Sequence, residues 1–136
     1  MEEEKDIRWK QRFQNFSRAM NLLRQAVERD QLNELEQVGL IQCFMFTFEL
    51  AWKTLKDKME DDGIVLDKIS PKDIIRDAYS AKYIDDAEIW LKMIKDRNLL
   101  SHTYNFQTFE DVSQIIKQLY IDELEKLYDD LMGDYL

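Results

Sequence analysis

Residues 39–52 read GLIQCFMFTFELAW, and they place apolar side chains on nearly every side of the helix that they would form. This stretch lies in the middle of a predicted helix over 33–61, with Asn33 as its N-cap and Gly63 just past its end. A helix that is apolar all round is buried on more than one face. In a small helical protein the second face is most often an oligomer interface, so the stretch predicts a central helix that also supports association.

The segment before this helix carries one apolar stripe with helical spacing. Six large apolar residues follow one another in steps of four and three, which places them on one side of a predicted helix over about 6–30. They are Trp9, Phe13, Phe16, Met20, Leu23 and Val27.

Three further helices are predicted after the central one. SPKD begins a short helix that runs to about Ala81, with Ser70 as its cap, Pro71 in its first turn and Asp73 as the capping-box acid. Asp85 or Asp86 caps a fourth helix, whose apolar residues are Ala87, Trp90, Leu91 and Ile94. Thr108 with Asp111 caps a fifth, whose apolar stripe is Val112, Ile115, Leu119, Leu124, Leu127 and Leu131.

These elements together predict an all-α fold. The chain has 136 residues, enough for one domain with a substantial core, and only three glycines and one proline, too few for many hairpins. We find no repeat and no linker. The expected architecture is an antiparallel, up-and-down bundle of four long helices with one short extra helix, forming a single domain over residues 1–136.

Composition limits the cellular setting and the class of protein. Hydrophobic residues make up 45% and charged residues 35%, which is typical of a globular protein. The opening MEEEKD is no secretory leader, and no apolar run reaches the roughly 18 residues that span a bilayer, so a cytoplasmic protein with no membrane contact is expected. The lone Cys43 agrees with a reducing compartment, and its apolar neighbours place it in the core.

Charge is unevenly distributed along the chain. The net charge of −9 argues against general binding of nucleic acid by the whole surface. Residues 5–30 nevertheless hold seven cationic side chains against three anionic ones, whereas residues 108–136 hold two against eight. A basic face on an acidic protein and an ordinary solvated helix surface are both compatible with this pattern.

The stretch RNLLSHTYN, residues 97–105, holds the only histidine of the chain. On a continuous helix Arg97 and Tyr104 share a face, Asn98 is next to His102, and His102 lies about 140° round the helix from Arg97. These side chains can converge only if the helix ends or bends near Ser101, or if a second copy of the motif completes the site.

A structural explanation of the same residues is also available. A histidine near a helix C-terminus can satisfy free carbonyls and interact with the helix dipole, without any chemical role. Other site chemistries find little support, because one histidine and one cysteine build no usual zinc site and the three glycines are isolated. No metal and no cofactor are therefore predicted, although carboxylate-only metal sites stay open.

The arginine, the polar residue after it and the His-x-Tyr of RNLLSHTY resemble the motif of HEPN-domain proteins. The chain is most similar to the nucleotidyltransferase substrate-binding proteins, or HepT-like toxins, whose apolar segment with an internal Glu-x-x-x-Lys resembles QCFMFTFELAWKTLKD. The resemblance covers about residues 10–130, and implies a single HEPN-like bundle domain. Met45 departs from it, since close relatives would carry an acidic residue there.

The resemblance implies a function. Members of this group dimerise so that two motifs face one another, act as metal-independent ribonucleases, and are held in check by a minimal nucleotidyltransferase antitoxin. A homodimer or higher even oligomer is thus expected, with RNA as substrate and Arg97 and His102 as catalytic residues. His102 would act as base or acid, and Arg97 would hold the phosphate. The partner would transfer AMP from ATP to Tyr104, placing an anion beside Arg97.

Asn98, Tyr104 and Glu49 are expected to support this site. Glu49 either pairs with Lys53 one turn away or orients Arg97 or His102 from the neighbouring helix. The same residues allow a second function, that of a noncatalytic substrate-binding subunit of a two-component nucleotidyltransferase. A plain helical interaction module is the third interpretation, and it would be favoured by motif residues that are buried and do not converge.

Overall fold

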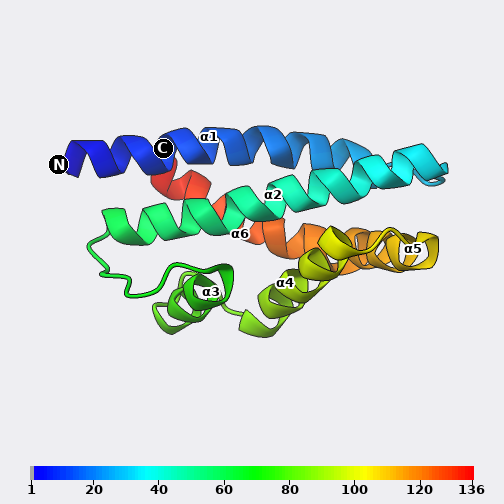
Figure 1. Ribbon diagram of the computed structural model, residues 1–136. Helices are drawn as coiled ribbons and strands as arrows, with labels where there is room; N and C mark the ends of the chain where they lie inside the picture. Colours follow the sequence, from blue (N-terminus) through cyan, green and yellow to red (C-terminus); the bar gives the residue numbers. More distant parts are fainter. Residues whose placement is uncertain (1) are drawn as a thin grey trace.

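The computed structural model describes the backbone of residues 2–136 and the side chains from Asp6 onward. Its helices are α1 (Glu2–Val27), α2 (Glu34–Asp61), α3 (Pro71–Ser80), α4 (Ala87–His102), α5 (Phe106–Ile115) and α6 (Ile121–Tyr135) (Figure 1). A π-helical turn, η1 (Ile116–Tyr120), joins α5 to α6, so these three form one long helical stretch. No strand occurs in the part of the chain described, and the predicted all-α fold class is confirmed.

The long helices lie alongside one another in alternating directions. α1 and α2 form an antiparallel pair, and α6 returns along α1, with the C-terminus close to the first half of α1 (Figure 1). Three contacts fix the antiparallel register of α1 and α6, because Gln14 meets Tyr135, Ser17 meets Tyr128 and Arg24 meets Glu125. α3 is the short extra helix, packed between α2 and α4.

The predicted caps of α2, α3 and α4 are present. Asn33 accepts from the backbone N–H of Glu36 at 2.8 Å, and the Glu36 side chain accepts from Asn33 in return at 3.1 Å. Ser70 caps α3, and of the two candidates for α4 it is Asp86 that accepts from Ile89. Gly63 follows α2 with a φ of 92°, a left-handed conformation that glycine adopts without steric cost.

The core is rich in aromatic side chains. Phe44 of α2 stacks on Phe48 and on Tyr120, with ring centroids 6.2 and 5.5 Å apart, and Phe48 also contacts Trp90 of α4. All six residues of the predicted stripe on α1 face this interior, and only Val27 at its end is not fully buried. Tyr120 donates to Asp96 at 2.5 Å, which satisfies its buried hydroxyl.

Two predictions for the last helix are wrong. Thr108 is not the cap, since Asn105 accepts from the Thr108 backbone N–H at 3.1 Å and the helix therefore begins at Phe106. Leu119 is not part of the buried stripe, because its side chain is 38% exposed. The π-turn explains why Leu119 is exposed. It contains one residue more than a regular α-helical turn, and Ile116 and Tyr120 face the core instead.

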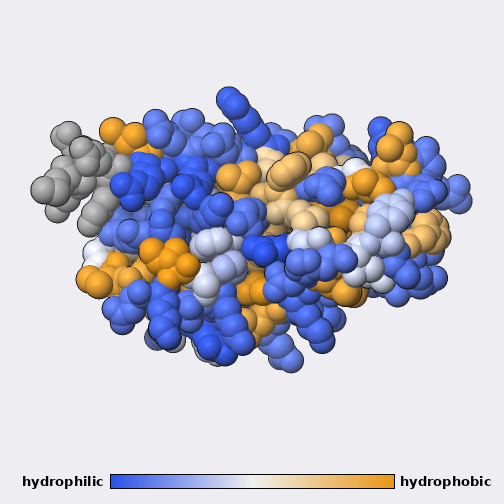
Figure 2. Space-filling view, viewed as in Figure 1, coloured by the Kyte–Doolittle hydropathy of each residue, from blue (hydrophilic) through white to orange (hydrophobic). Residues whose placement is uncertain are grey.

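α2 presents one face to solvent. Leu35, Gly39, Gln42, Phe46 and Glu49, spaced by four, three, four and three, form what we call the outward stripe of α2. Leu35 is 80% exposed and Phe46 is 63% exposed, although both are large apolar residues. Figure 2 shows hydrophobic residues gathered over the middle of α2, within a surface that is otherwise mostly polar.

Candidate functional site

The motif RNLLSHTYN occupies the C-terminal end of α4, from Arg97 to His102, and the link that follows it. α4 continues without a bend through Ser101 and ends at His102, where Thr103 takes an extended conformation. The Ser101 hydroxyl donates back to the Arg97 carbonyl at 2.9 Å, a hydrogen bond within the helix. The helix end that could bring the motif residues together thus comes after His102 and not before it.

Arg97 is held in place by residues on two helices. Its Nη2 donates to Oε2 of Glu49 at 2.9 Å, and its Nη1 donates to the Asn98 side chain at 3.0 Å. The guanidinium lies 6.0 Å from the centre of the Phe48 ring, which supports it from the core side. With only 24% of its side chain exposed, Arg97 has a defined position at the edge of the bundle.

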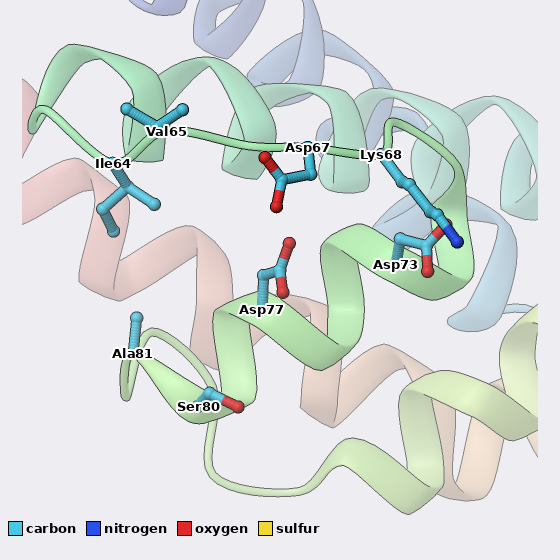
Figure 3. Close-up of a pocket in the computed structure, with 8 residues that line it drawn as sticks. All are labelled: Ile64, Val65, Asp67, Lys68, Asp73, Asp77, Ser80 and Ala81. Atoms are coloured by element: carbon cyan, nitrogen blue, oxygen red, sulfur yellow. The ribbon is translucent and has the colours of Figure 1, made fainter.

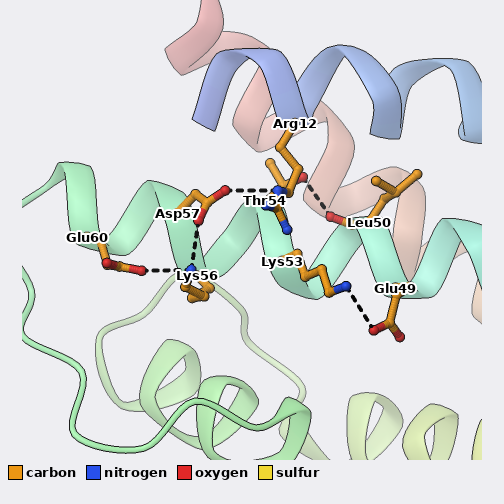
Figure 4. A network of polar contacts seen from close by, with 8 residues as sticks. All are labelled: Arg12, Glu49, Leu50, Lys53, Thr54, Lys56, Asp57 and Glu60. Carbon is orange, nitrogen blue, oxygen red and sulfur yellow. Dashed lines mark hydrogen bonds and ion pairs between the residues drawn. The ribbon is translucent and has the colours of Figure 1, made fainter. Parts of the chain in front are cut away.

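Glu49 takes part in both of the contacts considered for it. Besides Arg97 it meets Lys53 of its own helix, with Nζ 3.4 Å from Oε1, and Figure 4 shows this pair on the side of α2 that faces away from α1. Its side chain is 35% exposed, so it is only half-buried. Burial acts to raise the pKa of Glu49, but the nearby Trp52 indole and the cations Arg97 and Lys53 outweigh it, and the pKa lies below its usual value.

Figure 4 also shows a second polar network farther along α2, which has a structural role. Asp57 is buried, and its carboxylate meets Arg12 of α1 at 3.0 Å and Lys56 at 3.0 Å. Lys56 also pairs with Glu60 at 3.1 Å. A buried carboxylate is costly unless it is paired, and these cations supply the pairing. The network joins α1 to α2 away from the motif.

His102 is exposed at the end of α4 and has no hydrogen-bond partner among the described side chains. Asn98 is exposed too, and its side chain contacts Arg97. Since α4 is regular between Arg97 and His102, the two side chains leave it about 140° apart. A single chain therefore does not bring the arginine and the histidine together.

Tyr104 stands on a three-residue link between two capped helices. Thr103 ends α4 and Asn105 caps α5, both with extended backbone. The ring is 66% exposed, and one side of it rests on Phe109, with centroids 5.1 Å apart. Its hydroxyl donates to Oε1 of Glu34, the first residue of α2, at 2.8 Å. This hydrogen bond, with lesser effects of desolvation and charge, raises the pKa of Tyr104.

Tyr104 and Arg97 do not share one site within the chain. Their partners Glu34 and Glu49 are fifteen residues apart on α2, which corresponds to about 22 Å of helix. Even with long side chains on both sides, the phenol oxygen and the guanidinium lie too far apart for contact. While Tyr104 is bonded to Glu34, its hydroxyl therefore does not lie beside Arg97 of the same chain.

A hollow of about 340 Å³ lies beside Arg97 on the outward face of α2. Its lining comes from α2 and α4. Sequence reasoning found Arg97, Glu49 and the departure at Met45, but it did not single out Gln42 and Phe46 as part of a site. The sequence feature that could have identified them is the spacing from Gln42 to Phe46 to Glu49, which puts all three residues on one side of the helix. The lining residues are Gln42, Met45, Phe46, Glu49, Arg97 and Ser101.

A larger hollow lies elsewhere in the described part of the chain. It measures about 540 Å³ and lies between α3 and the loop after α2, where Asp67 and Asp77 point toward one another (Figure 3). Asp73 at its edge is already bonded to Ser70.

No group of three or more histidine, cysteine or acidic residues with metal-binding geometry occurs among the described residues. Within the same part of the chain, no helix is long and apolar enough to cross a membrane.

The chain matches the family model described as "Nucleotidyltransferase substrate binding protein like" over residues 11–133. This match includes all the helices apart from the ends of α1 and α6, and it contains every motif residue described above.

Two individual proteins are also similar. One is named "Probable ribonuclease HepT", from Haemophilus influenzae, and is 39% identical over 70 residues, which are 49% of this chain and 48% of the relative. The match thus spans about half the length of that relative. The other is a crystal structure of a protein from Thermus thermophilus, with a TM-score of 0.72 and 26% identity, covering 88% of this chain and 98% of that one.

Proposed function

The chain belongs to the family of nucleotidyltransferase substrate-binding-like proteins, and from this premise we propose that it is the HepT-like toxin of a toxin–antitoxin pair. It acts as a dimeric, metal-independent endoribonuclease. A partner minimal nucleotidyltransferase silences it by transferring AMP from ATP to Tyr104. The likeness to a protein named as a ribonuclease supports the proposal, and because that match is partial the activity as a whole is inferred.

The observation that carries the proposal is the setting of Arg97. A guanidinium has five N–H donors, and here one is bonded to Glu49 and one to Asn98. Arg97 lines an open hollow, and its remaining donors could hold phosphate oxygens there in the planar, bidentate manner suited to arginine. A purely structural arginine has no need of an open hollow beside it.

A second copy of the chain completes the site. His102 is exposed but turned away from Arg97 of its own helix, so a two-fold pair is needed to bring the histidine of one protomer toward the arginine of the other. The outward stripe of α2, which ends at Glu49, supplies exposed apolar residues beside the motif. Burying Leu35 and Phe46 against a partner would stabilise such a pair.

The pair supplies the groups that RNA cleavage requires. One His102 takes the proton of the 2′-hydroxyl as its oxygen forms a bond to phosphorus. The other His102 protonates the 5′-oxygen as its bond to phosphorus breaks, leaving a cyclic phosphate and a 5′-hydroxyl. Histidine has an unperturbed pKa near 6.5 and can serve in either role. Arg97 stabilises the charge that develops on the non-bridging oxygens.

Cleavage of RNA by the purified chain tests the proposal. His102→Ala and Arg97→Ala should each lower the rate at least about a hundredfold, while the helical content and oligomeric state remain those of the wild type. Lys92→Ala is the matched control, because it removes one cation from an exposed position of the same helix. Full activity in His102→Ala would refute the catalytic assignment.

The noncatalytic alternative, a substrate-binding subunit of a two-component nucleotidyltransferase, has one observation in its favour. Glu49 already neutralises much of the Arg97 charge, which would suit a surface that binds a partner or substrate without chemistry. A wild-type chain that cleaves no RNA in any sample, but forms a complex with the nucleotidyltransferase, would favour this function.

A further inference from the structure

Glu34 has no assigned role, yet it is the hydrogen-bond partner of the Tyr104 hydroxyl. We propose that Glu34 is the residue of this chain that aims the Tyr104 hydroxyl and accepts its proton when Tyr104 receives AMP. This inference rests on the proposed AMP transfer and adds the group on the acceptor side of that reaction. Nothing in the sequence connects the two residues, which are seventy positions apart.

The geometry presents Tyr104 as a prepared acceptor. Tyr104 is 66% exposed, so the active site of another protein can reach it. Its ring and its hydroxyl are nevertheless both held by contacts within the chain. Phe109 holds one side of the ring, and the Glu34 carboxylate holds the hydroxyl at 2.8 Å. The backbone on both sides belongs to residues that end or cap a helix, which limits the freedom of the link. Fixing a nucleophile in this way lowers the entropic cost of reaction.

Glu34 also suits the chemistry of the step. The Tyr104 oxygen forms a bond to the α-phosphorus of ATP, the bond from that phosphorus to the bridging oxygen breaks, and pyrophosphate leaves. The phenol loses its proton during the attack, and the acceptor must be within hydrogen-bond reach. The Glu34 oxygen is already there. The raised pKa of Tyr104 agrees with a phenol that stays protonated until the attack begins.

The same contact ends once the transfer is complete. The modified tyrosine has no hydroxyl proton to donate, and its phosphodiester is an anion next to a carboxylate. Like charges at this distance repel one another. Modification therefore releases Tyr104 from α2 and frees the adenylyl group to move toward another surface, including the Arg97 hollow of a second protomer.

The test is the rate of AMP addition to the full-length chain by the partner nucleotidyltransferase with ATP and Mg²⁺, followed by intact-mass analysis. Glu34→Gln keeps an oxygen that can accept the Tyr104 hydrogen bond but cannot take the proton, and it should lower kcat for the transfer about a hundredfold with an unchanged KM for the chain. Glu34→Ala should lower kcat at least as far, and Glu34→Asp should restore part of the rate. Glu110→Gln, an exposed residue of α5 with the same change of charge, is the control and should react like the wild type.

The outcomes separate this inference from the proposed function. If the wild type gains AMP and Glu34→Gln gains it at the same kcat, Glu34 has no role in the transfer while the proposed silencing stands. If Glu110→Gln is slowed as much as Glu34→Gln, the effect comes from surface charge and the inference fails as well. If the wild type gains no AMP at all, the role of Glu34 and the proposed silencing by AMP transfer are both refuted.

Discussion

Arg97 and Tyr104 are seven residues apart in the sequence, yet their side chains are bonded to carboxylates fifteen residues apart on α2. α2 thus carries a separate partner for each, Glu49 for the arginine and Glu34 for the tyrosine. The proposed cleavage site and the proposed modification site are therefore distinct places on one chain. In the proposed mechanism, AMP on Tyr104 would reach an Arg97 only after Tyr104 leaves Glu34, or it would act by blocking access to the site.

Glu49→Gln tests whether the carboxylate orients Arg97. We expect RNA cleavage to fall about tenfold with little loss of fold, because the ion pair that fixes the guanidinium becomes a weaker hydrogen bond to a neutral acceptor. Initial rates of cleavage by the purified variant measure the effect. Glu60→Gln, farther along the same helix, is the matched control. Equal rates for Glu49→Gln and the wild type would contradict an orienting role.

Tyr104→Phe should abolish the mass gain that the wild type shows after incubation with the partner nucleotidyltransferase and ATP. The ring still packs on Phe109, so the fold should be kept, but the attacking oxygen is gone. The variant should also remain active on RNA in the presence of the partner, provided that it cleaves RNA by itself. A mass gain that persists in Tyr104→Phe would place the modification on another residue.

Phe46→Glu should convert a dimer into a monomer at micromolar concentration. Phe46 is 63% exposed in the middle of the outward stripe of α2, and a carboxylate there would have to be desolvated on association. Sedimentation velocity gives the measurement. Leu22→Glu, at a 55% exposed position of α1, is the control and should leave the association unchanged. A wild type that sediments as a monomer would remove the two-fold site altogether.

Glu123→Gln should stabilise the chain at neutral pH and not in acid. Burial raises the pKa of Glu123, and Asp85 and Asp86 act in the same direction, while Lys126 and the Trp90 indole act against it and do not cancel the rise. A carboxyl with a raised pKa favours folding while it is protonated, and this contribution is lost as the pH rises through that pKa.

The measurement for Glu123 is a series of urea unfolding curves from about pH 4 to pH 7. The free energy of unfolding of Glu123→Gln should exceed that of the wild type by an amount that grows with pH. The reason is that the amide cannot ionise and can still accept a hydrogen bond from Trp90. Asp122→Asn, an exposed neighbour on the same turn, should show no such growth. A gain that is the same at both ends of the range would contradict the assignment.

Much of the fold follows from local patterns that the sequence displays directly. The stripe from Trp9 to Leu23 predicts the buried side of α1. Asn33, Ser70 and the alternative of Asp85 or Asp86 predict where three helices begin, because a cap is a local hydrogen bond. The prediction of a core position for Leu119 is wrong, since a regular helical period cannot anticipate a π-turn. The cap of α5 is Asn105, three residues before the predicted Thr108, because both residue types can cap a helix.

The candidate site is less predictable because it depends on contacts between distant segments. The motif indicates Arg97, His102 and Tyr104, and the i, i+4 spacing indicates the Glu49–Lys53 pair. For Glu49 the sequence leaves a bond to Arg97 as one of two alternatives, and for Tyr104 it gives no sign of the bond to Glu34. Both bonds require the packing of α4 and the following link against α2, which no local pattern specifies.

The π-turn between α5 and α6 has a consequence for how the length of this chain can vary. Removing one residue from a regular α-helix turns all later side chains by about 100°. η1 already contains one residue more than a regular turn, and losing it would leave α5 and α6 with their apolar sides on the same core. A deletion elsewhere in this long helix would rotate Leu124, Leu127 and Leu131 toward water. Relatives one residue shorter in this helix should therefore have their gap at 116–120.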